Sequence, residues 1–165
     1  MAYQSQDSQA QVYLLCRAAD RLCALPIGQV SETMRILPIS PISGAPDVVR
    51  GISVIRGAPT PVVDLSKLVD GGDVEPRRLV TIKVGPRVVA LLVQDVVGVR
   101  TIPAQSMTTL PPLLRDAADK AVVAVGILDR ELLLFLTDLR VLAAAATSAP
   151  HETINTTINA AQASP

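Results

Sequence analysis

The side chains that could carry metal or nucleophilic chemistry are few. The chain has two cysteines, Cys16 and Cys23, and one histidine, His151. Two thiols and a distant imidazole are fewer ligands than a zinc site needs. A serine nucleophile needs a nearby base, and His151 lies in a polar C-terminal stretch. We therefore expect neither a metal site nor a catalytic triad.

The aspartates offer a second kind of chemistry. Asp64 and Asp138 each stand just before a Leu-x-x-Leu sequence. A pair of carboxylates can perform acid–base catalysis, so an enzyme that uses Asp64, Asp95 or Asp138 stays an alternative. Their simpler role is to cap short helices, because an aspartate oxygen accepts hydrogen bonds from N–H groups of the first turn. No glycine-rich phosphate-binding motif is present. The sequence thus predicts no enzyme and no cofactor.

Composition excludes several other classes of function. The 165 residues are 49% hydrophobic, which is enough for a packed core, and 15 basic residues balance 15 acidic ones. A nucleic-acid-binding protein is expected to carry a basic surface and, for single strands, aromatic platforms, whereas this chain has two Tyr, one Phe and no Trp. Its apolar runs are too short to span a bilayer, and its N-terminus has no apolar signal segment. We expect a cytoplasmic protein.

The elements that must position these residues are short strands, because β-rich runs alternate with turns rich in Pro and Gly. If residues 19–20 form a hairpin loop, Cys16 and Cys23 lie opposite each other, where a strained disulfide is possible but two reduced apolar side chains are favoured. Short helical turns are expected at 45–50, 66–69 and 139–146. The expected strands are 11–17, 22–27, 52–55, 60–64, 79–84, 87–93, 97–102, 121–128 and 132–137.

An internal repeat organises these strands into two related halves. Residues 21–30 align with 87–96 at an offset of 66, and Arg56 to Leu68 align with Arg130 to Leu142 at an offset of 74. The matching order favours two homologous barrel halves, at 12–70 and 79–146, with exchange of strands between them left open. Polar tails at 1–11 and 147–165 and a turn-rich linker at 71–78 complete the predicted organisation.

Several segments of this repeat carry a family resemblance. The most specific block is 51–65, which contains Ile-Arg-Gly at 55–57 and Pro-Val-Val-Asp-Leu at 61–65. The others are 24–27, Val30, Glu32, Pro38, Pro41, 44–46, 49–50, 88–95 and Val99. Together they cover about residues 11–143 and resemble the CheW family of chemotaxis coupling proteins. One position departs from the family pattern, since Val54 stands where family members usually carry Asn.

The resemblance implies a mainly β fold of two similar, intertwined five-stranded SH3-like barrels with a few short helices. It also implies a non-enzymatic adaptor that couples chemoreceptors to a histidine kinase in a signalling array. We expect the cleft between the halves to take the cytoplasmic tip of a chemoreceptor, and the apolar strand ends of the second half to meet the kinase regulatory domain. The alternatives are a paralogous CheW-like scaffold in a non-chemotaxis pathway and a β-barrel module that binds a small ligand or peptide.

The same resemblance gives a set of candidate partner-binding residues. Arg56 is expected to pair with Glu32 and shape a receptor-facing surface, because the planar guanidinium binds carboxylates through two hydrogen bonds. For Val30 the alternative is core packing, and for Gly51 it is a β-bulge. The complete set is Val30, Glu32, Gly51, Arg56, Gly57 and Val99.

Overall fold

Short β-strands make up most of the molecule. The computed structural model describes residues 9–69, 71–111 and 121–136. In these ranges the strands are β1 (Gln11–Ala18), β2 (Arg21–Pro26), β3 (Val30–Arg35), β4 (Val49–Ile55), β5 (Ala58–Asp64), β6 (Arg78–Val84), β7 (Arg87–Val93), β8 (Asp95–Ile102), β9 (Met107–Thr109), β10 (Ala124–Leu128) and β11 (Glu131–Phe135). The helical elements are α1 (Leu65–Leu68) and the 3-10 turns η1 (Ile27–Gln29) and η2 (Ala104–Ser106).

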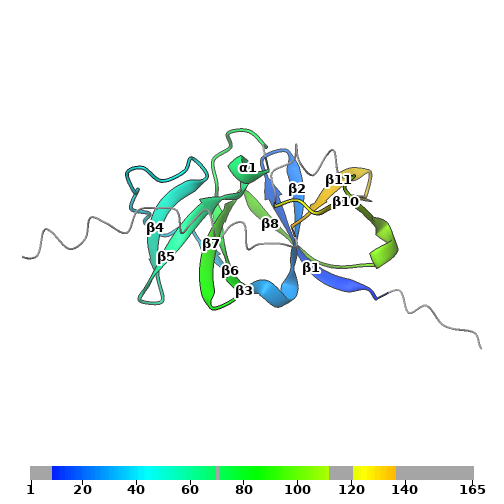
Figure 1. The fold of residues 1–165 in the computed structure, drawn as a ribbon, viewed down its shortest axis with the longest axis horizontal. Helices are drawn as coiled ribbons and strands as arrows, with labels where there is room; N and C mark the ends of the chain where they lie inside the picture. The colour runs from blue at the N-terminus through cyan, green and yellow to red at the C-terminus, as the bar shows by residue number, and fades with distance from the viewer. Residues whose placement is uncertain (1–8, 70, 112–120, 137–165) are drawn as a thin grey trace, which may run out of the picture.

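The strands form two sheets that lie side by side along the long axis of the molecule (Figure 1). One has six strands in the order β8-β1-β2-β11-β10-β9, and the other has five in the order β3-β6-β7-β5-β4. Each sheet contains one hairpin from the other half of the sequence: β1–β2 joins β8–β11, and β6–β7 joins β3–β5. Because of this hairpin exchange, the boundary predicted at 71–78 does not separate the residues of one sheet from those of the other.

The two sheets share one plan, which defines equivalent positions. Cys16 pairs with Val96 in one sheet and Ile82 pairs with Val30 in the other, so the offset of 66 is confirmed. The β4–β5 and β10–β11 hairpins turn at residues 56–57 and 129–130, which sets the second offset at 73. The predicted offset of 74 is wrong by one residue, because leucine-rich strands align almost equally well in either register.

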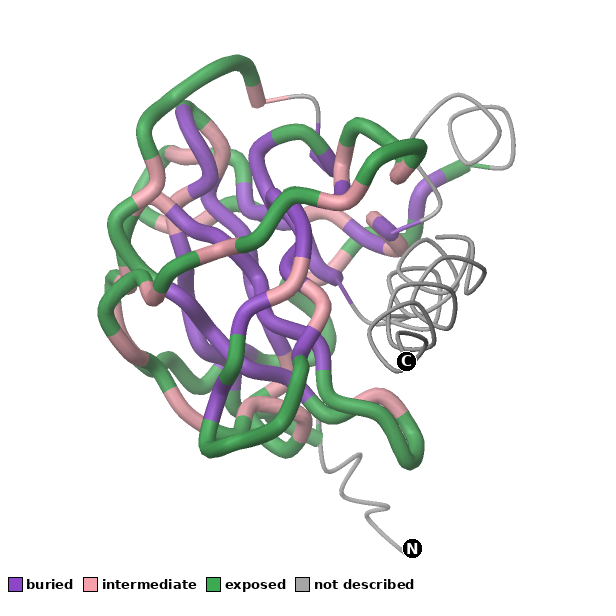
Figure 2. The backbone as a smooth tube through the Cα atoms, turned by 90° about the vertical axis from the view of Figure 1, so that its left-hand side faces the viewer, coloured by how far each residue is buried: buried purple, intermediate pink, exposed green. Residues whose placement is uncertain are grey.

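Three apolar clusters hold the sheets together, and the buried positions run through the middle of both (Figure 2). The largest cluster draws on strands of both sheets and includes Leu14, Cys16, Leu25, Val63, Val80 and Leu91. A second belongs to the six-stranded sheet and contains Tyr13 and Phe135, whose rings meet edge to face with centroids 5.2 Å apart. The third belongs to the five-stranded sheet and contains Ile55, Val62, Leu79, Ala90 and Leu92. Burial on both sides explains the continuous apolar runs of β2 and β7.

Local predictions have mixed outcomes. The β1–β2 hairpin is confirmed, and its two-residue loop places Cys16 opposite Cys23 as free, buried thiols. The turn at 66–69 is confirmed as α1, whereas the helical turn expected at 45–50 is wrong because Val49 and Arg50 begin β4. The turn at 139–146 lies outside the described residues. Among the helices of the described ranges, none is long and apolar enough to cross a membrane.

Candidate partner-binding site

An ion pair between Arg56 and Glu32 joins the two edges of the five-stranded sheet. Glu32 lies on β3 and Arg56 in the β4–β5 turn, so the pair bridges the first and last strands in the sheet order. Arg56 Nε donates to Glu32 Oε1 at 2.8 Å, and Nη2 donates to Oε2 at 2.6 Å. This forked geometry is the expected pairing of the two residues. It shows that the sheet curls enough to bring side chains from its two edges within hydrogen-bond distance.

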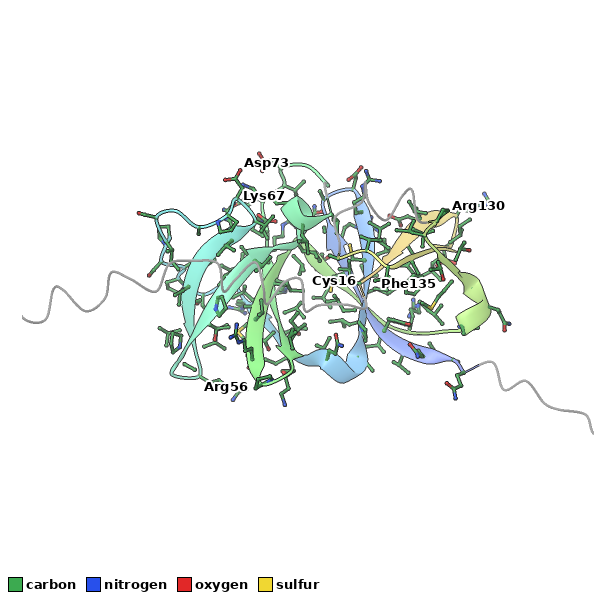
Figure 3. The ribbon with its side chains drawn as sticks, viewed as in Figure 1. Cys16, Arg56, Lys67, Asp73, Arg130 and Phe135 are labelled. Carbon is green, nitrogen blue, oxygen red and sulfur yellow. The ribbon has the colours of Figure 1, made fainter. Side chains whose placement is uncertain are left out.

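The side chains of this pair are accessible to a partner protein and both carry a charge. The Arg56 side chain is 79% exposed and that of Glu32 is 27% exposed, and Arg56 lies at the surface near the lower edge of the molecule in Figure 3. The hydrogen bond from Arg56 lowers the pKa of the Glu32 carboxyl, and the same bond raises the pKa of Arg56. Both groups are therefore charged at neutral pH. A guanidinium has five N–H donors, and Glu32 takes two of them, so donors remain for a partner.

Gly51 stands where the chain itself makes a close backbone approach. Its φ is +139°, and a Cβ at this position would lie 2.1 Å from the carbonyl oxygen of Ser40. Ser40 forms a short bridge to β4, with its N–H donating to Ile52 O at 2.8 Å and the Ile52 N–H donating back at 2.9 Å. Gly51 lies at a bulge and lets residues 38–41 lie against β4. Its evident role is to complete the sheet.

The remaining candidates are spread over both sheets. Gly57 is exposed beside Arg56 in the same turn, with a φ of +78°. Val30 is half-buried on β3 and packs against the largest apolar cluster. Val99 is 50% exposed on β8, the edge strand of the other sheet. The structure thus brings Glu32, Arg56 and Gly57 together at one corner and places Val99 on a separate sheet.

The sequence reasoning missed a pair of exposed apolar positions. Ile127 on β10 is 76% exposed and lies opposite Leu132 on β11, which is 48% exposed. With the offset of 73, Val54 on β4 is the equivalent of Ile127, and it is 65% exposed. The repeat was the signal that could have found them, but the one-residue error in its alignment hid the equivalence.

A shallow pocket borders Ile127. It has a volume of about 80 Å³ and is lined by Ile102, Leu133 and Phe135 together with parts of η2 and β10. Pockets for drug-sized ligands are several times larger, at roughly 300–1,000 Å³. The pocket therefore gives little support to the alternative of a small-ligand module.

The aspartates have structural partners. Asp64 caps α1, since its Oδ1 accepts from the N–H groups of Ser66 at 3.0 Å and Lys67 at 3.4 Å, and this capping prediction is confirmed. Asp95 Oδ1 accepts from the N–H of Val96 at 2.9 Å. Asp138 and His151 lie outside the described residues. Nowhere in the described part do three His, Cys, Asp or Glu side chains gather as a metal site.

Comparison with known proteins identifies the family to which this fold belongs. The model of the CheW-like domain family matches residues 12–146, nearly all of the chain between the expected tails. This chain belongs to the CheW-like family. Its relative Protein FrzA of Myxococcus xanthus is 29% identical over 127 residues, which cover 75% of this chain and 79% of FrzA.

A solved structure supports the same fold. The scaffolding protein TtCheW from Thermoanaerobacter tengcongensis matches this CheW-like chain with a TM-score of 0.68 at 24% identity, over 78% of this chain and 89% of TtCheW. The predicted fold, mainly β with two SH3-like barrels and few helices, is confirmed. The three-residue strand β9 makes one sheet six-stranded. The family match and the structural match thus agree on the fold of this chain.

Proposed function

We propose that this CheW-like protein is a non-enzymatic adaptor that couples the cytoplasmic tips of chemoreceptors to a chemotaxis-type histidine kinase. The observation that carries the proposal is the exposed Arg56–Glu32 fork, whose residues both lie at positions that resemble the family. The fork presents a fixed, charged corner suited to polar groups of a partner. The adaptor would act in the cytoplasm, at receptor arrays.

The six candidate residues divide between direct and indirect roles in this proposal. Arg56, Glu32 and Gly57 form the corner that contacts the receptor tip, and Val99 offers an apolar contact on the other sheet. Val30 and Gly51 act through shape, because Val30 packs on the central cluster and Gly51 lies against the Ser40 backbone.

The kinase regulatory domain would dock on the apolar strand ends of the second barrel. Ile127 and Leu132 are cross-strand neighbours with exposed side chains. Exposed apolar side chains that lie together mark protein interaction sites more often than scattered ones do. Positional coupling then follows, since one rigid unit holds the receptor and the kinase.

A second candidate is a CheW-like scaffold in a chemosensory pathway other than chemotaxis. It is favoured by Val54, which replaces the usual Asn of the family and is largely exposed beside the Arg56 turn. An apolar residue at this surface position would alter the partner that the corner accepts.

The test measures binding of the purified chain to a cognate receptor tip and to a kinase regulatory domain by co-elution on a sizing column at tens of micromolar. Arg56→Glu should weaken receptor binding at least tenfold, about 1.4 kcal/mol, because it removes the fork and places two carboxylates together. Arg56→Lys, which keeps the charge without the fork, should fall between wild type and Arg56→Glu.

Lys83→Glu is the matched control, since it makes the same charge change at an exposed site on β6. It should leave receptor binding within about twofold of wild type. Equal binding by Arg56→Glu and wild type would remove the corner from the receptor site, and failure of the kinase domain to co-elute would count against coupling itself.

A further inference from the structure

Two arginines lie directly opposite each other on paired strands of the five-stranded sheet. Arg35 on β3 and Arg78 on β6 are register partners, and both are exposed. Side chains at such positions stand on the same face of the sheet, with Cβ atoms about 5 Å apart. Like charges in this arrangement destabilise a sheet. The arginine pair therefore lowers the stability of the sheet, and its presence needs an explanation other than folding.

Neither arginine is neutralised within the described ranges 9–69, 71–111 and 121–136, where no ion pair to Arg35 or Arg78 is found. Other arginines of the same sheets do have carboxylate partners: Arg17 pairs with Glu131 and Arg56 with Glu32. The protein as a whole has no excess of positive charge. Arg35 and Arg78 are thus two adjacent, exposed guanidiniums without a carboxylate partner among the described residues.

The repeat shows that the fold does not require this pair. The equivalent positions in the six-stranded sheet are Val12 and Thr101, which are register partners on β1 and β8. An uncharged pair builds the same strand pairing at the same place in the second barrel. The arginine pair is therefore a feature of one barrel's surface.

We propose that Arg35 and Arg78 form a docking point for a carboxylate side chain on the protein that this scaffold binds. Two guanidiniums side by side supply paired N–H donors that match the two oxygens of an aspartate or glutamate. Arg35 lies on β3, the edge strand that also carries Glu32, and Arg78 lies on the neighbouring strand β6, so the pair is at the same edge of the sheet as the candidate partner-binding site. A polynucleotide fits poorly, because two charges and few aromatics do not form a nucleic-acid surface. The inference rests on the proposed function in that the partner is a protein.

The test uses a double variant, Arg35→Thr with Arg78→Val, which installs the residues of the equivalent barrel positions. A fluorescent helical peptide with glutamates at positions i and i+4 is the probe, measured by anisotropy at low salt. The variant should bind the peptide at least about fivefold more weakly than wild type, and a Gln-substituted peptide should bind neither. Lys67→Thr with Lys83→Thr removes the same charge elsewhere and should stay within about twofold.

Equal affinity of the double variant and wild type for the glutamate peptide would overturn the docking point. Binding to vesicles containing phosphatidylglycerol, with no binding of the peptide, would overturn it in favour of a lipid phosphate. Arg35→Gln supplies a milder variant if the double substitution impairs folding. The kinase and receptor co-elution measured in parallel distinguishes the two proposals: wild type that binds the peptide at this site but neither protein would refute the adaptor function alone.

Discussion

Replacing Gly51 by alanine tests whether this residue completes the barrel or contacts a partner. The added Cβ would lie 2.1 Å from Ser40 O, 2.7 Å from Ser40 C and 2.9 Å from Pro41 Cα. All three neighbours are backbone atoms, so no flexible side chain can move aside. The φ of +139° is also a conformation that residues other than glycine rarely adopt.

The expected magnitude follows from these two features. The unfavourable backbone conformation costs about 1–3 kcal/mol. Relief of the clash must displace Ser40 and weaken its two hydrogen bonds to Ile52, each worth about 1 kcal/mol. The sum is about 3–5 kcal/mol, a large part of the 5–15 kcal/mol that stabilises a typical domain.

Urea unfolding followed by circular dichroism measures this loss, and Gly57→Ala is the matched control. Gly57 also has a positive φ, of +78°, but nothing lies within 4 Å of the position of its Cβ, so its substitution should cost about 1–2 kcal/mol. Gly51→Ala should therefore exceed it by about 1–4 kcal/mol. Equal costs for the two variants would refute the close approach to Ser40. A stable Gly51→Ala that loses receptor binding would instead make Gly51 a contact residue.

Two further predictions concern pH. Burial raises the pKa of the Cys16 and Cys23 thiols from 9.0 to about 12, so the folded state keeps protons that the unfolded chain releases above about pH 9. The free energy of unfolding should therefore fall as the pH rises towards 12, by at most about 1.4 kcal/mol per pH unit for each cysteine. Urea unfolding between about pH 7.5 and 10 should show a steeper loss of stability for the wild type than for the double variant Cys16→Val with Cys23→Val. The hydrogen bond from Arg17 lowers the pKa of Glu131, so this pair stabilises the folded state above the ordinary pKa of 4.5 and stabilises it less as the pH falls. Because both side chains are over a third exposed, Glu131→Gln should lower the free energy of unfolding by under about 1 kcal/mol at pH 7 and by nothing measurable at pH 3. An equal loss of stability at both pH values would contradict the ion pair.

Sequence reasoning succeeded where a local signal specifies the structure. The two-residue loop at 19–20 fixed the pairing of Cys16 with Cys23, and the aspartate before Leu-Ser-Lys-Leu indicated the capped turn α1. The Arg56–Glu32 pair came from the family resemblance, because the two residues are far apart in sequence and no local pattern joins them.

Tertiary arrangement was harder to predict, for physical reasons. Strand β3 has alternating half-buried and exposed residues but few strongly apolar ones, and residues 30–35 were therefore not among the predicted strands. The hairpin exchange leaves no local trace, because β1–β2 and β6–β7 have the same internal pairing whichever sheet they join. Ile127 belongs to the predicted strand 121–128, whose continuous apolar run does not show which of its side chains are exposed.

Comparison of the two barrels with each other separates residues that build the fold from those that serve a partner. Val30 has Val96 as its equivalent, and both pack against the central cluster, which indicates that the fold itself needs an apolar side chain there. Glu32 and Arg56, by contrast, correspond to Gly98 and Asp129, which cannot form the same pair. A feature that one barrel has and its structural twin folds without is not explained by folding. Glu32 and Arg35 on β3, Arg56 in the β4–β5 turn and Arg78 on β6 are such features. Their position around the edge strand β3 supports the proposal that this edge of the five-stranded sheet recognises a partner.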